Sequence, residues 1–193
     1  MPNLYIISGC NGAGKTTASF TILPEMLDCK EFVNADEIAK GLSPFQPESV
    51  SFQAGRIMIE RIEELITLEV NFGFETTLTT LSYVNTIKLA KEKGYTVTLI
   101  YFWLDNVNLA IERVKLRVSE GGHNIPEEVI RRRYFRGMAN LTVKFINICD
   151  YWIVINNSSR PFNFVAEGQG AEDLKIHDSI VWETIKNQAS EEQ

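Results

Sequence analysis

The most informative residues of this 193-residue chain form a glycine-rich segment near its start. The segment satisfies the pattern G-x-x-x-x-G-K-[ST], which is typical of loops that bind the phosphates of a nucleotide. In such a loop the backbone amides point at the phosphates, Lys15 carries a positive charge to them, and the hydroxyl of Thr16 can be a ligand of Mg²⁺. The segment predicts a bound nucleoside triphosphate; the alternative is a glycine-rich turn without a ligand. The residues expected to contact the triphosphate are Gly9, Cys10, Asn11, Gly12, Ala13, Gly14, Lys15, Thr16 and Thr17.

Two acidic side chains stand where they could act on the same triphosphate. Asp36 follows a predicted strand at 31–35, and Glu75 ends a predicted strand at 71–75. Functional side chains of parallel α/β folds collect beyond the carboxyl ends of the strands, so both carboxylates are expected beside the glycine-rich loop. One could accept the proton of an attacking hydroxyl, and the other could hold the acceptor or the water shell of the metal. The alternatives are an N-cap for Asp36 and a solvated strand end for Glu75.

Arginines gather on two predicted helices on either side of a Gly-Gly pair at 121–122. They are Arg113, Arg117, Arg131, Arg132, Arg133 and Arg136. Residues four apart share a helix face, so Arg113 pairs with Arg117, and Arg132 with Arg136. This arrangement predicts a lid at about 113–136 that closes over ATP, neutralises charge on the transferring phosphoryl group and excludes water.

The alternative for the arginine helices is a solvated surface on which glutamates pair with the arginines. The glutamates available are Glu112, Glu127 and Glu128. His123, between the two helices, has no second type of metal ligand nearby. We expect it to shape the loop rather than to act as a catalytic base.

The hydrophobic pattern predicts the elements that hold these side chains. Apolar runs predict strands at 4–7, 31–35, 71–75, 95–104 and 151–155. Helical spacing predicts helices after Thr17, where Pro24 should end or kink the helix, and at 47–70, 83–93, 107–119 and 126–148. The alternation predicts an α/β fold with a parallel sheet between layers of helices. One domain, 1–193, is expected, with only residues 189–193 frayed.

Composition limits the partners and the compartment. A net charge of −6 argues against a broad nucleic-acid surface. The three cysteines, Cys10, Cys29 and Cys149, have no metal-like spacing and are expected to be reduced thiols of a cytosolic protein. No signal peptide and no apolar run of about 18 residues is seen, so neither export nor a membrane partner is expected. Cys10 could be oxidation-sensitive through a lowered pKa; the alternative is a small buried residue.

These segments together resemble the zeta-toxin family of P-loop kinases, in the compact branch labelled predicted ABC-type ATPases. The resemblance spans nearly the whole chain in consistent order. It rests on Gly9–Thr17, Val33–Ala39, Ala54–Arg56, Phe74–Leu78, Gly121–Pro126 with Arg132–Tyr134, and Asp150–Trp152 leading to Asn156–Ser158.

The resemblance implies a kinase that uses ATP and Mg²⁺ to phosphorylate a sugar hydroxyl of a UDP-N-acetyl amino sugar. In this interpretation the chain is a cytoplasmic small-molecule kinase with an antitoxin protein as a possible partner that blocks the ATP site. By this resemblance Asp36 is the general base, and Glu75, Thr76 and Arg56 lie at the acceptor. The alternative for Arg56 is an arginine on the surface of its helix. The lid arginines would stabilise the transition state, although the sequence does not rank them. Arg117 and Arg133 are assigned to catalysis, Arg132 and Arg136 to ATP, and the segment 156–161 to the adenine. A kinase of a nucleotide or an antibiotic, and a non-catalytic ATP-binding module acting through a partner, remain as alternatives.

Overall fold

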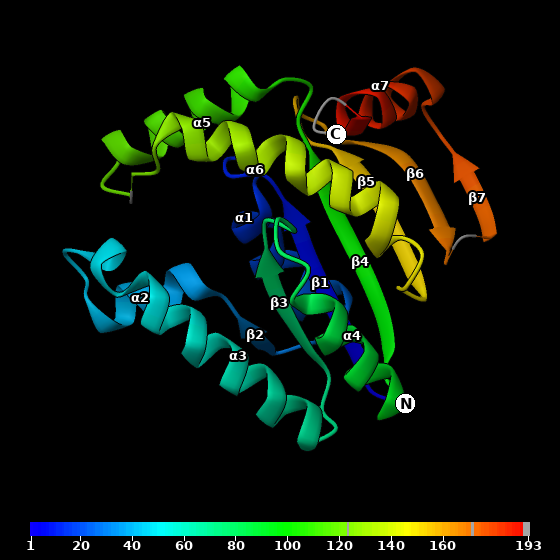
Figure 1. The fold of residues 1–193 in the computed structure, drawn as a ribbon, viewed down its shortest axis with the longest axis horizontal. Helices are drawn as coiled ribbons and strands as arrows, with labels where there is room; N and C mark the ends of the chain where they lie inside the picture. Colours follow the sequence, from blue (N-terminus) through cyan, green and yellow to red (C-terminus); the bar gives the residue numbers. More distant parts are fainter. Residues whose placement is uncertain (123, 171, 191–193) are drawn as a thin grey trace.

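The computed structural model describes residues 1–122, 124–170 and 172–190. Within them the strands form one seven-stranded sheet in the order β2-β3-β1-β4-β5-β6-β7 (Figure 1). The strands are β1 (Asn3–Gly9), β2 (Glu31–Val33), β3 (Phe72–Thr76), β4 (Thr96–Trp103), β5 (Tyr151–Asn156), β6 (Asn163–Gln169) and β7 (Glu172–Ile176). Strands β1 to β5 pair in parallel, whereas β6 and β7 are antiparallel to their neighbours. The carboxyl ends of the parallel strands therefore meet at one edge.

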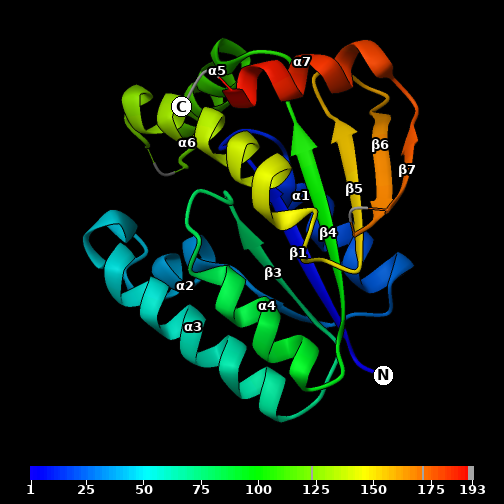
Figure 2. The ribbon, with the colours of Figure 1, turned by 45° about the vertical axis from the view of Figure 1, so that its right-hand side comes forward.

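Helices pack against both faces of the sheet. They are α1 (Lys15–Thr21), η1 (Ile22–Met26), α2 (Ala35–Leu42), η2 (Pro47–Val50), α3 (Ser51–Thr67), α4 (Tyr83–Glu92), α5 (Val107–Ser119), α6 (Glu127–Asn140), η3 (Leu141–Phe145) and α7 (Ser179–Ser190). In Figure 2, α1 lies behind the sheet, and α4, α6 and α7 lie in front of it. The predicted three-layer α/β fold is confirmed.

The central strands follow the predicted hydrophobic runs closely. β1 is buried over six of its seven residues, and Leu4, Ile6 and Ile7 are fully enclosed. β4 begins and ends one residue inside the range predicted for it. Strands covered by helices on both faces need apolar side chains on both faces, which explains these continuous runs. The rigid centre of the sheet thus holds the end of β1, where the glycine-rich loop begins.

The prediction missed the last three elements and described the sheet as parallel throughout. β7 is exposed along its whole length at the edge of the sheet, so it shows no alternation of buried and exposed residues. α7 covers β5 and β6, where Trp182 stacks on Trp152 with ring centres 5.6 Å apart. The expectation that 189–193 is frayed is wrong for Ala189, which is buried in α7, and residues 191–193 lie outside the described part.

Two predicted helices change their hydrogen-bonding pattern near the end. Pro24 lies in the π-helical turn η1, so the first helix continues to Met26 in altered form, in agreement with a Pro-induced kink. The helix predicted at 126–148 is α6 followed by a second π-helical turn, η3. No helix among the described residues is long and apolar enough to cross a membrane.

Candidate active site

The glycine-rich loop connects β1 to α1 at the carboxyl edge of the sheet. Its backbone passes so close to β4 that a Cβ atom on Gly9 would lie 2.2 Å from the carbonyl oxygen of Phe102. Gly14 has a φ of +85°, in the left-handed region that favours glycine, and forms the N-cap of α1. Gly9 leaves no room for a side chain, and the positive φ of Gly14 disfavours one, so the fold requires glycine at both ends of the curled backbone that could cradle phosphates.

Lys15 and Thr16 both contact Glu75 of β3. Lys15 Nζ donates to the carbonyl oxygen of Cys10 at 3.0 Å and lies 3.5 Å from Glu75 Oε1. Thr16 Oγ1 donates to Glu75 Oε2 at 2.8 Å. β3 is the direct neighbour of β1, with Glu75 in register with Ile7, which brings the carboxylate beside the loop. Glu75 is only 10% exposed. It is therefore a partner of the phosphate-binding residues and not a solvated strand end.

Asn34, and not Asp36, caps helix α2. The side-chain oxygen of Asn34 accepts a hydrogen bond from the backbone amide of Asp36 at 2.8 Å. Asp36 stands in the first turn of the helix with its side chain exposed. The N-cap interpretation of Asp36 is therefore wrong, and its carboxylate is available for chemistry.

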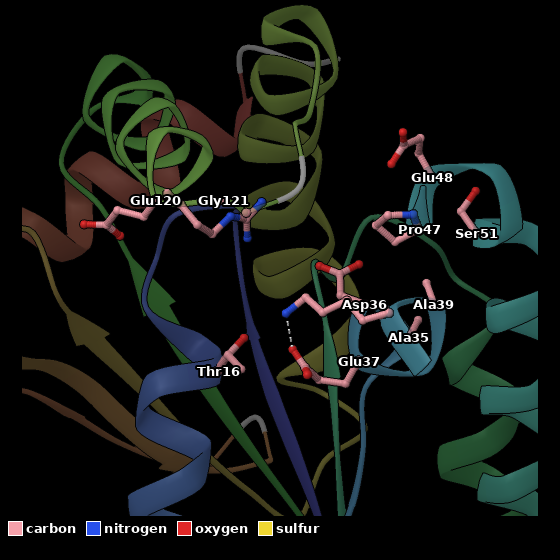
Figure 3. Close-up of a pocket in the computed structure, with 13 residues that line it drawn as sticks. Thr16, Ala35, Asp36, Glu37, Ala39, Pro47, Glu48, Ser51, Glu120 and Gly121 are labelled. Atoms are coloured by element: carbon pink, nitrogen blue, oxygen red, sulfur yellow. Dashed lines mark hydrogen bonds and ion pairs between the residues drawn. The ribbon is translucent and has the colours of Figure 1, made fainter. Parts of the chain in front are cut away.

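A cavity of about 490 Å³ opens between the phosphate loop and α2 (Figure 3). Thr16 stands on one side, and Asp36 and Glu37 of α2 stand on the other. The start of α3 and the end of α5 complete the wall, with Ser51 and Arg117 among the lining residues. A small molecule bound in this cavity would lie between the Asp36 carboxylate and the phosphate loop.

Two of the lid arginines contact the phosphate loop: Arg113 Nη1 lies 3.5 Å from the carbonyl oxygen of Gly12, and Arg133 of α6 contacts Asn11. Arg133 Nη1 donates to Asn11 Oδ1 at 3.2 Å. Burial lowers the pKa of Arg133 below the usual arginine value, while the negative charge of Asp36 opposes this effect. The guanidinium therefore lies within electrostatic reach of Asp36 as well as of the loop.

The other arginines have different environments. Arg117 lines the cavity, and its catalytic role stays a prediction. Arg132 and Arg136 are exposed, and no described contact joins them to the phosphate loop. Of the glutamates expected to pair with these arginines, Glu127 instead pairs with Lys115 at 2.6 Å and joins α6 to α5. The segment predicted as a lid, 113–136, covers the second half of α5 and most of α6, while His123 lies outside the described residues.

Arg113 was predicted as a lid residue and instead ties two loops together. Its guanidinium donates to the carbonyl oxygens of Asn157 and Ser158, each at 2.9 Å. Asn157 Nδ2 in turn donates to the carbonyl oxygen of Ala13 at 2.8 Å. The segment expected to hold the adenine is thereby fixed to the phosphate loop. Sequence spacing groups Arg113 with Arg117 and gives no sign of these loop carbonyls.

Two residues predicted at the acceptor lie elsewhere. Arg56 is exposed on α3 and does not line the cavity, which agrees with the alternative of a helix-surface arginine. Thr76 is buried, and its hydroxyl accepts a hydrogen bond from the backbone amide of Leu78 at 3.0 Å. Thr76 therefore stabilises the turn after β3 instead of facing an acceptor.

The thiol of Cys10 is 2% exposed. Burial raises the pKa of Cys10 from 9.0 to about 11, and this effect exceeds the lowering by the nearby Lys15 charge. The hypothesis of a lowered pKa is wrong, and the small buried residue is the correct interpretation. The described residues contain no group of three or more His, Cys, Asp or Glu side chains that could hold a metal. A cation here would rely on Thr16, phosphate oxygens and water.

A glycine-rich loop between β1 and the helix that follows it, with acidic and basic groups gathered at the carboxyl edge of a parallel sheet, defines a P-loop nucleotide-binding fold. The family model described as Zeta toxin matches residues 1–160. The chain belongs to the zeta-toxin family.

The chain is also similar to a relative in another bacterium and to solved structures. An uncharacterized protein of Haemophilus influenzae is 35% identical over 128 residues, which are 65% of this chain and 88% of the relative. The crystal structure of AvrRxo1-ORF1:AvrRxo1-ORF2 with sulphate ions has a TM-score of 0.76 and 17% identity, covering 96% of this chain. The chain spans 63% of the length of that protein. The PezAT toxin-antitoxin structure from Streptococcus pneumoniae has a TM-score of 0.65 and 18% identity. The match covers 98% of this chain and 85% of the PezAT chain. At these identities the structures establish the fold, which is that of zeta-toxin-like P-loop kinases.

Proposed function

We propose that this chain is an ATP-dependent phosphotransferase that transfers the γ-phosphate to a hydroxyl of a small molecule. The observation that carries the proposal is the cavity that Asp36 and Thr16 line together. A hydroxyl bound there would have a carboxylate on one side and the phosphate loop on the other. This is the arrangement that general-base catalysis of phosphoryl transfer requires.

The residues present fit ATP and Mg²⁺. The backbone of β4 leaves no room for a side chain at Gly9, Gly14 has a positive φ, and Lys15 bridges a loop carbonyl and Glu75. Thr16 would be a ligand of Mg²⁺, with Glu75 orienting its hydroxyl at 2.8 Å. When bound, Mg²⁺ neutralises charge on the phosphates.

In the reaction the acceptor oxygen forms a bond to the γ-phosphorus as the bond between that phosphorus and the bridging oxygen of ADP breaks. Asp36 accepts the hydroxyl proton, and Lys15, Arg133 and Arg117 stabilise the negative charge of the phosphoryl group. Closure of α5 and α6 over the site would exclude water, so that transfer to the acceptor competes with hydrolysis.

We infer the acceptor and the partner from family membership. A UDP-N-acetyl amino sugar is the first acceptor to test, followed by nucleosides and aminoglycosides. The PezAT neighbour is a toxin-antitoxin system, which supports an antitoxin protein as the partner of this chain in the cytoplasm. The AvrRxo1 complex has also been solved with ATP, which supports ATP as the donor.

The decisive experiment is the Asp36→Asn variant, assayed with labelled ATP against this panel of acceptors. Loss of the base should lower transfer roughly 10²- to 10⁴-fold while ATP affinity, measured by calorimetry, stays near that of the wild type. Asp28→Asn is the matched control, because Asp28 is an exposed residue in the turn before β2. Turnover by Asp36→Asn at the wild-type rate would remove Asp36 as the base.

A further inference from the structure

We propose that Asn34 is a positioning residue that fixes the Asp36 helix relative to Glu75 and the phosphate loop, a role that rests on the proposed phosphotransferase function. The side chain of Asn34 is buried between the two carboxylate-bearing elements, at 6% exposure. The oxygen and the nitrogen of its amide each form a hydrogen bond to a different one of these two elements.

The oxygen end of Asn34 holds helix α2. Oδ1 accepts from the backbone amide of Asp36 at 2.8 Å and so caps the first turn of the helix. A cap of this kind fixes where the helix begins, and Asp36 lies two residues after the cap. The position of the proposed base therefore depends on this hydrogen bond.

The nitrogen end of Asn34 holds Glu75. Nδ2 donates to Glu75 Oε2 at 2.9 Å, and Thr16 Oγ1 donates to the same oxygen at 2.8 Å. β2 and β3 are adjacent parallel strands with Val33 in register with Phe74, so Asn34 and Glu75 are the next pair along the two strands. The strand pairing makes this contact a fixed feature of the fold.

Asparagine is the cap residue suited to both tasks. Serine, threonine and aspartate also cap helices, but a hydroxyl is too short to serve both segments, and aspartate has no donor for a second carboxylate. One buried amide thus sets the distance between the proton acceptor and the residues that bind phosphate. Errors of about 1 Å in such distances cost about 10²-fold in rate.

The test is the Asn34→Ser variant, because serine keeps the cap and removes the link to Glu75. We expect kcat for acceptor phosphorylation to fall roughly 10- to 100-fold, as for the loss of other partners that orient metal-site residues, with the thermal midpoint close to that of the wild type. Asn106→Ser is the matched control. Asn106 caps α5 by accepting from the Leu109 amide at 2.9 Å, and its other end bonds to Asp105 instead of to a site residue. The kcat of the Asn106→Ser variant should equal that of the wild type.

A double-mutant cycle separates positioning from general stability. If Asn34 acts through Glu75, the effects of Asn34→Ser and Glu75→Gln on kcat should be non-additive. ATP affinity in the presence of Mg²⁺ can be measured without an acceptor. The effects of the same two substitutions on this affinity should also be non-additive. Additive effects in both measurements, or a kcat for Asn34→Ser equal to that of Asn106→Ser, would overturn the inference. A wild-type protein that phosphorylates no acceptor would instead count against the proposed function, and the affinity cycle would still decide the role of Asn34.

Discussion

Adjacent arginines on α6 have different surroundings, although they have the same chemistry. Arg133 is half-buried and bonded to Asn11, whereas Arg132 and Arg136 are exposed. The sequence predicts that this helix carries arginines toward ATP but does not rank them. The rotation of the helix against the sheet decides which one contacts the loop, and that rotation depends on packing of the whole helix.

We expect Arg133→Ala to lower the rate of phosphoryl transfer roughly 10²-fold or more, because under the proposed function the charge of Arg133 stabilises the transition state. Arg132→Ala removes the same charge from the exposed neighbouring position and should change the rate less than about threefold. Steady-state kinetics with a saturating acceptor measures both effects. Equal losses in the two variants would show that the lid turns its other face to ATP during the reaction.

The buried thiol of Cys10 gives a second residue-level prediction. Its pKa of about 11 means that the thiol is neutral at pH 7 and should react with a disulfide reagent only after unfolding. The ordinary pKa is 9.0, so the stability linked to this group is fully present below pH 9 and is lost as pH rises through about 11. Urea unfolding at several pH values should show a smaller alkaline loss for Cys10→Ala than for the wild type.

At the scale of elements, α6 packs against the backbone that follows β3 as well as against side chains of the sheet. A Cβ on Gly137 would lie 2.7 Å from the carbonyl oxygen of Thr77 and 3.3 Å from the hydroxyl of Tyr101. Gly137 and Arg133 are four residues apart and share a helix face. The glycine therefore sets how closely the helix approaches the sheet, and with it the reach of Arg133 toward Asn11.

We predict that Gly137→Ala destabilises the protein by about 1–3 kcal/mol and lowers the transfer rate, because α6 must shift outward. Gly55→Ala is the contrasting variant, since a Cβ there meets nothing within 4 Å on α3. That substitution should stabilise the protein by about 0.4–1 kcal/mol without changing the rate. Thermal unfolding and kinetics on both variants check the prediction. A rate loss in Gly55→Ala, or none in Gly137→Ala, would contradict it.

The sequence predicts individual helices and strands better than it predicts which of them lie side by side in the fold. The runs that became β1 and β4 and the spacing of α3 are local patterns, and they predict those elements correctly. The contact of Glu75 with Lys15 and Thr16 depends on β3 pairing with β1, which the order of the strands along the chain does not disclose. Likewise β7 shows no alternation of buried and exposed residues, because its position at the edge of the sheet leaves all five residues exposed.

At the scale of the whole molecule, the family match ends at residue 160, but the sheet continues. β6 extends the sheet beyond β5 and supports α7, which buries Trp182 and Ile185 against it. Tyr134 also links this region to the site, because its hydroxyl donates to the carbonyl of Leu104 and bonds to Gln188 of α7. The last three elements therefore stabilise the helix that carries Arg133.

Trp182→Ala should lower the free energy of unfolding by about 3–5 kcal/mol, because it removes a buried ring stacked on Trp152. Ile180→Ala, on the exposed face of the same helix, should change the free energy by less than about 0.5 kcal/mol. Urea unfolding followed by tryptophan fluorescence measures both, with circular dichroism as a second probe for the variant that lacks a tryptophan. Comparable losses in the two variants would mean that α7 contributes little through this stacking.

The wall of the cavity opposite the phosphate loop comes largely from one continuous stretch of chain, from Ala35 to Ser51. The groups expected to hold the donor come from Gly9–Thr17, β3 and α6. Under the proposed function, changes to this segment of 17 residues outside Asp36, the proposed base, should alter the choice of acceptor while the groups that hold ATP stay in place. Mutation of the segment that keeps Asp36 is thus a route by which one phosphate-transfer scaffold could acquire new acceptors.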